Sequence, residues 1–197
     1  MKAFGGAFLQ DSVTSPVRTR GEMKSSRTVR PWPVSESLAE ALFNCGDFLE
    51  DSGEFRAAFE CFRAAAEAGH AICQCRLGLM YSAGKGVRKD LKKAAYWYRK
   101  SFNNRTRMNG LTSAAMNLAS DLKNSGDIRG AIRWLEKARA LEDGSACLEL
   151  AKIYAVRKTG MKKTESLLRE VLASTIDNAS ELDKEEAKHM LENLLGN

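Results

Sequence analysis

The residues that come closest to a chemical site are a histidine and two cysteines in the stretch His70-x-x-Cys73-x-Cys75. Imidazole nitrogens and thiolates are the ligands of tetrahedral zinc sites. Residues two positions apart on a helix, however, point about 200° away from each other around its axis. The Cys73 and Cys75 thiols would therefore diverge, and we predict that this triplet holds no metal.

A second candidate is a phosphate-binding loop, suggested by Gly78 and by the pair Gly84-Lys85. Such a loop places four residues between its two glycines and a serine or threonine after its lysine. Here five residues separate the glycines, and Gly86 follows the lysine. The sequence therefore predicts no nucleotide site at this position.

The remaining nucleophiles and bases form no catalytic pattern. His189, the second of two histidines, is far from His70 in the sequence. The five thiols are odd in number and stand mostly where small apolar residues would pack, so we expect all of them to be reduced (Cys45, Cys61, Cys73, Cys75 and Cys147). We therefore predict that the protein is not an enzyme and has no catalytic residue and no cofactor.

The chain carries a formal net charge of +6, and its basic residues are clustered. One cluster and the bases that follow it could attract nucleic acid or an anionic membrane surface (Lys85, Arg88, Lys89, Lys92, Lys93, Arg99, Lys100, Arg105 and Arg107). Asp90 interrupts this cluster, and we identify no aromatic residues interleaved with the bases as stacking platforms for single strands. A solvated outer edge is the preferred interpretation, and nucleic-acid binding stays open as an alternative.

Helix hairpins that recur along the chain are the elements that must position these residues. Small residues recur at one position of each first helix (Gly46, Gly78, Ala119 and Ala151) and at one position of each second helix (Ala58, Ala94, Ala131 and Thr164). Bulky pairs follow three to four residues after the second set (Cys61-Phe62, Trp97-Tyr98, Trp134-Leu135 and Leu167-Leu168). One hairpin cannot bury its apolar face alone, so such units stack. We expect Trp97 and Trp134 to be wedged between successive helix pairs.

Two regions follow from this pattern. Residues 1–34 form a basic arm with three prolines and no helical periodicity, which we expect to be disordered or loosely docked. Residues 35–197 form the repeat domain, with hairpins at about 37–68, 71–102, 110–140 and 144–173 and a capping helix at about 179–195. No run of about eighteen apolar residues predicts a membrane span. The first residues make a weak signal peptide, so we expect a cytoplasmic protein.

The second hairpin carries a family resemblance. Its marker residues are His70-Ala71, Gln74, Leu77-Gly78, Met80-Tyr81, Gly84-x-Gly86-Val87, Asp90, Lys93-Ala94 and Trp97-Tyr98-x-Lys100. This pattern closely resembles a Sel-1-like repeat, a relative of the tetratricopeptide repeat. The flanking hairpins lack the Gly-x-Gly-Val turn and resemble the tetratricopeptide class in spacing. The resemblance implies an all-α fold, a right-handed α-α superhelix of about four helix hairpins plus a C-terminal capping helix, which serves protein partners and has no catalytic residues.

The tetratricopeptide geometry also implies which residues line the inner groove of the superhelix. The predicted lining is Glu40, Phe43, Asp47 and Glu50 in the first hairpin, Ile72, Cys75, Leu79 and Ser82 in the second, Ser113, Met116, Ser120 and Lys123 in the third, and Ser145, Leu148, Lys152 and Ala155 in the fourth. In this order the groove runs from acidic through apolar to basic. We therefore expect a ligand segment with a basic end, an apolar middle and an acidic end.

These observations predict a noncatalytic adaptor that binds a protein or peptide partner in its concave groove. We expect a bacterial, monomeric protein, and one specific form is an immunity or chaperone-like partner of a toxin or secreted effector. Two alternatives stay open. One is nucleic-acid binding through the basic clusters. The other is small-molecule binding or hydrolysis, as the penicillin-binding activity attributed to some disulfide-rich members of the family implies, although their cysteine pattern is missing here.

Overall fold

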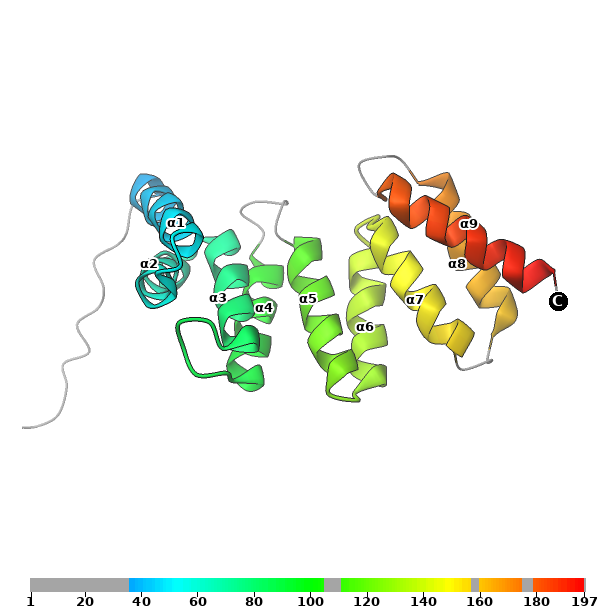
Figure 1. Ribbon diagram of the computed structural model, residues 1–197, viewed down its shortest axis with the longest axis horizontal. Coiled ribbons are helices and arrows are strands. Elements are labelled where there is room, and N and C mark those ends of the chain that lie inside the picture. The colour runs from blue at the N-terminus through cyan, green and yellow to red at the C-terminus, as the bar shows by residue number, and fades with distance from the viewer. Residues whose placement is uncertain (1–35, 105–110, 157–159, 175–178, 197) are drawn as a thin grey trace, which may run out of the picture. The chain divides into compact units, whose positions relative to one another are not determined.

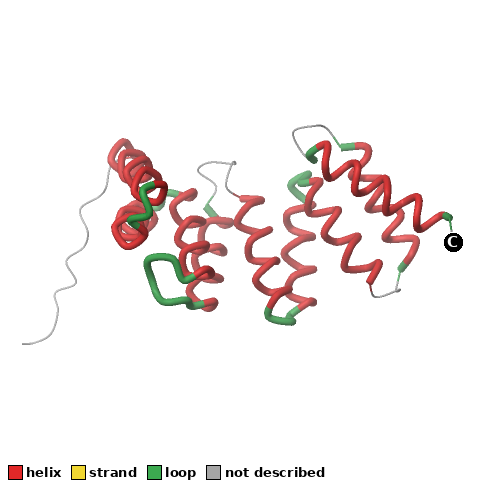
Figure 2. Tube along the Cα trace, viewed as in Figure 1, coloured by secondary structure: helices red, strands yellow, loops and turns green. Residues whose placement is uncertain are grey.

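The computed structural model describes residues 36–104, 111–156, 160–174 and 179–196. The arm predicted at residues 1–34 lies outside these ranges, as do Arg105 and Arg107 of the basic cluster. All regular structure in the described residues is α-helical (Figure 2). The prediction of an all-α helical repeat fold is therefore confirmed.

Nine helices are described, and they form four hairpins followed by a last helix (Figure 1). Their bounds are α1 Glu36–Asp51, α2 Phe55–Glu67, α3 Ala71–Ala83, α4 Leu91–Asn103, α5 Leu111–Asn124, α6 Ile128–Arg139, α7 Gly144–Val156, α8 Met161–Ala173 and α9 Glu181–Leu195. These bounds differ from the predicted ones by at most two residues.

Each helix packs against the next one along the chain, both within a hairpin and between hairpins. Two pairs of helices that are not adjacent along the chain also meet, because α3 contacts α5 and α7 contacts α9. The apolar side chains form two clusters of buried residues, one in the α1–α5 region and one from α5 to α9. Phe102, Leu122 and Trp134 pack against both clusters, so the core continues from one to the other.

The small residues of the first helices lie where the two helices of a hairpin cross. A side chain on Gly46 would overlap the ring of Phe62, and one on Gly78 would overlap the ring of Tyr98. In the third and fourth hairpins the corresponding residues are alanine and leucine, and all of them are buried (Ala119, Leu135, Ala151 and Leu168). The predicted close-packing positions are thus the observed ones.

Tyr98, and not Trp97, fills the crossing within the α3–α4 hairpin and is 1% exposed. The wedge of Trp97 between successive hairpins stays a prediction. Trp97 is only partly buried at the edge of the core, with the Lys100 ammonium 4.9 Å from its ring centre. Trp134 does bridge two hairpins, since its ring meets Phe102 of α4 edge-on at 5.3 Å. The sequence pair Trp97-Tyr98 did not reveal which ring points inward, because both fit the helical period within one residue.

The Gly-x-Gly turn after α3 brings its loop against the start of α2. Gly86 has a φ of +67°, and a side chain there would overlap the carbonyl group of Phe55. Only glycine accommodates both the left-handed backbone and this close approach. Asp90 then begins α4, since its carboxylate accepts hydrogen bonds from the backbone N–H groups of Lys92 and Lys93.

Candidate functional site

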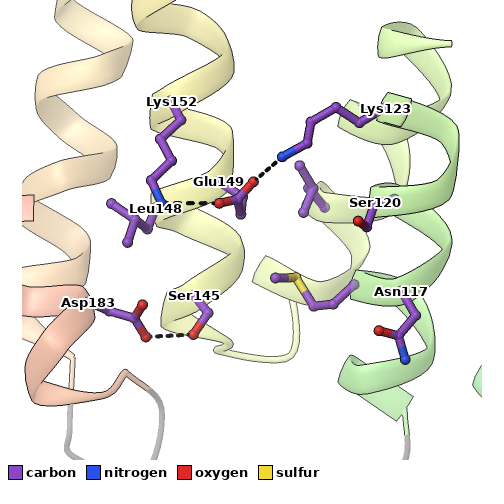
Figure 3. Close-up of a pocket in the computed structure, with 11 residues that line it drawn as sticks. Asn117, Ser120, Lys123, Ser145, Leu148, Glu149, Lys152 and Asp183 are labelled. Atoms are coloured by element: carbon purple, nitrogen blue, oxygen red, sulfur yellow. Dashed lines mark hydrogen bonds and ion pairs between the residues drawn. The ribbon is translucent and has the colours of Figure 1, made fainter. Parts of the chain in front are cut away.

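A groove lies between α5 and α7, and Asp183 from the first turn of α9 contributes to its lining (Figure 3). Its hollow measures about 360 Å³. The lining residues are Met116, Asn117, Ala119, Ser120, Lys123, Leu135, Ser145, Leu148, Glu149, Lys152 and Asp183. Six of them, namely Met116, Ser120, Lys123, Ser145, Leu148 and Lys152, are groove residues predicted from the sequence.

Charged side chains bridge this groove from one helix to the next. Lys123 of α5 donates a hydrogen bond to one Glu149 oxygen at 2.6 Å, and Lys152 donates to the other at 3.2 Å (Figure 3). Lys152 also lies 2.9 Å from the carboxylate of Glu186 in α9. Burial opposes ionisation of Glu149, but the hydrogen bonds from the two lysines outweigh it and lower its pKa. The three helices are therefore linked by one ion-pair chain.

The opposite end of the groove is held by a hydroxyl and a carboxylate. Ser145 of α7 donates to Asp183 at 2.8 Å (Figure 3). Asp183 also belongs to the capping box of α9, in which its carboxylate accepts from the backbone N–H of Ser180. Burial tends to raise the pKa of Asp183, yet the hydrogen bonds from Ser145 and Ser180 lower it overall. The last helix is thus fixed against the groove by its own N-terminal cap.

An apolar hollow of about 280 Å³ adjoins the groove. Its lining shares Lys123 and Lys152 with the groove and adds Ile128, Ile153 and Val156. The Val156 side chain is 85% exposed, although it is apolar. The groove therefore continues from a polar section, past the lysines, into an apolar section.

The predicted groove residues of the first two hairpins form a different kind of surface. Arg76 of α3 lies 3.1 Å from Asp47 and 3.6 Å from Glu50 of α1. Glu40 lies 3.3 Å from the ring nitrogen of His70, and the Phe43 ring stacks on the same histidine at 5.6 Å. Ion pairs and ring contacts thus occupy the acidic end that the sequence predicted.

Between these two ends, α3 presents a mixed surface. Leu79 is exposed and Ile72 is half-buried. Ser82 donates to Asp121 of α5 at 2.7 Å, and the Asn117 amide lies 3.7 Å from the Cys75 sulfur. The structure therefore brings six of the eight predicted lining residues of the third and fourth hairpins into one hollow, but not Ser113 and Ala155. The predicted acidic residues of the first hairpin are ion-paired, and those predicted on α3 form the mixed surface between the two regions.

Sequence reasoning missed Arg76, Glu149 and Asp183, which balance the charges of the predicted lining. Glu149 directly follows the predicted Leu148, so a broader reading of the α7 face could have found it. Asp183 has no such signal, because only the position of α9 brings it to the groove. The change from acidic to basic along the groove is weaker than the sequence predicted, because each end contains both positive and negative side chains.

His70 and Cys73, which the sequence raised as possible metal ligands, have structural partners. His70 caps α3, because its ring nitrogen accepts a hydrogen bond from the backbone N–H of Cys73 at 3.3 Å. Burial, followed by the carboxylates of Asp47 and Glu40, raises the pKa of the Cys73 thiol to about 12. Within the described residues no three His, Cys, Asp or Glu side chains are grouped to hold a metal ion.

All five cysteines are free thiols. The Cys45 and Cys61 sulfurs approach to 3.7 Å across the α1–α2 hairpin, which is beyond the length of a disulfide bond. Burial, and then Glu170, raises the pKa of the Cys147 thiol to about 12. At neutral pH the Cys73 and Cys147 thiols are therefore protonated and poorly nucleophilic.

None of the described helices is both long enough and apolar enough to cross a membrane.

The sequence of the chain matches one protein family. Three stretches, at residues 39–70, 71–104 and 113–143, match the Sel1 repeat. They correspond to the hairpins α1–α2, α3–α4 and α5–α6, and the hairpin α7–α8 falls outside them. The resemblance that the sequence showed most strongly in the second hairpin thus extends to its two neighbours.

One curated protein and one solved structure illustrate the relatives. Chitin synthase regulatory factor 3 of Schizosaccharomyces pombe is 29% identical over 145 residues, which are 70% of this chain and 16% of that protein. The chain therefore spans about one sixth of the length of this relative. The crystal structure of a Sel1 repeat protein from Oxalobacter formigenes superposes with a TM-score of 0.59 at 23% identity, over 79% of this chain and 71% of the other. At that identity the superposition supports the helical-repeat fold and nothing finer.

Proposed function

Because this chain is a Sel1-repeat protein, we propose that it is a noncatalytic scaffold that holds an extended segment of a protein partner in the α5–α7–α9 groove. Sel1-repeat proteins are generally scaffolds for protein–protein interaction. The observation that carries the proposal is the groove itself, which combines polar groups on two helices with an apolar extension.

The groove has features that suit a peptide. Met116 offers an apolar contact, while Ser120 and Asn117 offer hydrogen-bonding groups to a peptide backbone. The apolar hollow beside the lysines has room for one or two aliphatic side chains of the partner. Lys123 and Lys152 stand where these two sections meet, so a carboxylate of the partner could exchange with Glu149 as their acceptor.

A direct test places an arginine in the groove. Ser120 is exposed on the groove side of α5, so Ser120→Arg would fill the hollow without disturbing the core. Ser166→Arg makes the same change at an exposed site on α8, away from the groove. A partner identified with the wild-type protein should lose at least tenfold in affinity for Ser120→Arg and retain its affinity for Ser166→Arg, as measured by calorimetry. Equal binding by both variants would refute the groove as the site.

A narrower form of the proposal has a toxin or secreted effector as the partner and a monomeric, cytoplasmic protein as the scaffold. Co-expression tests it, because an immunity or chaperone-like protein should suppress toxicity or aggregation of its cognate partner. Ser120→Arg should abolish this protection while Ser166→Arg preserves it. Light scattering of the purified protein and cell fractionation test the monomeric state and the cytoplasmic location.

A further inference from the structure

A row of basic side chains follows the outer side of α4. Lys92, Tyr96, Arg99 and Lys100 are at positions i, i+4, i+7 and i+8, so they share one stripe of the helix. The stripe is about 12 Å long, from the rise of 1.5 Å per residue. Tyr96 is 55% exposed in its middle. The α4 helix contains no acidic residue at all.

The next outer helix, α6, repeats this arrangement. Arg129, Arg133 and Lys137 are all exposed and share one stripe. The acidic residue of α6, Glu136, is paired with Arg139 at 3.1 Å and with Lys163 at 3.1 Å. The three exposed bases of α6 have no ion pair with a carboxylate of the described residues.

The two stripes adjoin where Trp134 and Lys137 of α6 contact Phe102 of α4, and each stripe also carries a lysine over a tryptophan ring. Lys100 lies over the Trp97 ring at 4.9 Å, and Lys137 lies over the Trp134 ring at 3.7 Å. Lys137 also lies 5.6 Å from the ring centre of Phe102, which belongs to α4. The outer sides of α4 and α6 thus meet at this point and form one surface, which we call the basic stripe (Lys92, Tyr96, Arg99, Lys100, Arg129, Arg133 and Lys137).

The outer helices of the first and fourth hairpins are different. On α2, Arg63 pairs with both Glu60 and Glu67. On α8, Arg169 pairs with Glu165 at 2.9 Å. Opposite charges are therefore close to balanced on these two helices, with two bases and two glutamates on α2 and three bases and two glutamates on α8. The central helices carry an excess of bases, four against no acidic residue on α4 and four against one glutamate on α6.

We propose that the basic stripe binds single-stranded nucleic acid, with the bases on its phosphates and Tyr96 stacked on a nucleobase. Arginine and lysine side chains that form no ion pair with a carboxylate of the described residues suit a row of phosphates. An exposed aromatic ring within such a row is the feature that distinguishes single-strand binding from general attraction of anions. The sequence interpretation overlooked Tyr96 as this ring and overlooked the contribution of α6. An acidic protein segment or an anionic membrane lacks a planar base for Tyr96, so we regard both as alternative outcomes of the test.

Fluorescence anisotropy of the full chain with labelled 20-nucleotide oligo(U) and oligo(dT) tests this proposal. Three to five phosphate contacts should weaken binding about 15- to 130-fold between 50 and 200 mM salt, from a slope of about −0.7 per contact. The triple variant Lys92→Glu, Arg99→Glu, Arg133→Glu should bind at least about thirtyfold more weakly at 50 mM salt.

A matched control makes the same change of charge elsewhere. Arg56, Lys162 and Lys188 are exposed on α2, α8 and α9, and the triple change of these residues to glutamate should alter affinity by about threefold or less. Tyr96→Ala should weaken binding about tenfold, and Tyr96→Phe should restore it, because stacking needs the ring and not the hydroxyl. Circular dichroism verifies that each variant is folded.

Several results would overturn the proposal. The first is no binding of either oligonucleotide at 50 mM salt. Another is equal losses in the two triple variants, which would show that only net charge matters. Tighter binding to vesicles containing phosphatidylserine, or to poly-glutamate, would assign the basic stripe to a membrane or to an acidic protein. None of these results bears on the groove, because Ser120→Arg tests that surface separately.

Discussion

The first two hairpins and the last two solve the same packing problem with different side chains. In α1–α2 and α3–α4 a glycine faces an aromatic ring, Phe62 or Tyr98. In α5–α6 and α7–α8 an alanine is combined with Leu135 or Leu168 at the corresponding positions. The sum of the two side-chain volumes is what keeps each hairpin closed, because interiors are densely packed. A repeat can therefore drift from its consensus and still stack, as long as both residues change together.

The same difference separates the two halves on the inner side of the stack. In the first half, Arg76 fills the space between α1 and α3 with ion pairs to Asp47 and Glu50. In the second half, the small residues Ser120 and Ser145 line a hollow between α5 and α7. The part of the chain with the smaller side chains is thus the part with the candidate binding groove.

Loss of an aromatic ring should have the largest effect on stability. Tyr98→Ala removes a fully buried ring that packs directly on Gly78, so unfolding should be easier by about 3–5 kcal/mol. Trp97→Ala should cost clearly less, because that ring is only partly buried. Urea unfolding measures both. A larger loss for Trp97→Ala would contradict the inward position of Tyr98.

The second-largest effect on stability should come from exchanging the glycine–aromatic pair of the second hairpin for the alanine–leucine pair of the third. Gly78→Ala puts a methyl group into the Tyr98 ring, which should cost about 1–3 kcal/mol. Tyr98→Leu alone should leave a cavity. The double variant Gly78→Ala, Tyr98→Leu reproduces the third hairpin and should be more stable than the sum of its single changes implies. Strictly additive losses in a double-mutant cycle would disprove the idea that the two volumes compensate.

The outcome at these positions shows how far sequence reasoning reaches. The small residues Gly46, Gly78, Ala119 and Ala151 could be predicted, because helix crossings tolerate little volume and the repeat places them regularly. The ends of the hairpins could be predicted to within two residues from the repeat.

Three-dimensional neighbours could not be predicted in the same way. Whether Trp97 or Tyr98 points into the core depends on the rotation of α4 about its own axis. The helical period of the sequence does not define that rotation finely enough to separate two adjacent residues. Asp183 reaches the groove only because α9 folds back onto α7, and Arg76 pairs across two helices. Of the groove, the sequence therefore indicated the helices and most of the lining, but not the charges that balance it.

Replacing the alanine–leucine pair of the third hairpin by a glycine–aromatic pair should have a smaller effect on stability. Ala119→Gly removes a buried methyl group and loosens the helix, which together should cost about 2 kcal/mol. Ala57→Gly on the exposed side of α2 is the matched control and should cost about 1 kcal/mol. Leu135→Phe should be better tolerated in the Ala119→Gly protein than in the wild type. If the ring is equally destabilising in both proteins, the third hairpin does not follow the volume rule of the second.

The smallest expected effect is electrostatic and belongs to the second half alone. Glu149 has a lowered pKa in the folded protein because its hydrogen bonds from Lys123 and Lys152 outweigh its burial. A lowered folded-state pKa means that the contribution to stability is fully present above the unfolded value, about 4.3 for glutamate. It is lost as the pH falls through the lower, folded-state pKa.

Glu149→Gln should therefore be less stable than the wild type at pH 7, by under about 1 kcal/mol, and the difference should disappear at low pH. Glu185→Gln, at an exposed position of α9, is the matched control for the loss of one negative charge. Urea unfolding between pH 3 and 7 gives the answer, and a wild-type advantage that persists unchanged at pH 3 would mean that Glu149 stabilises the groove by packing and not by its charge.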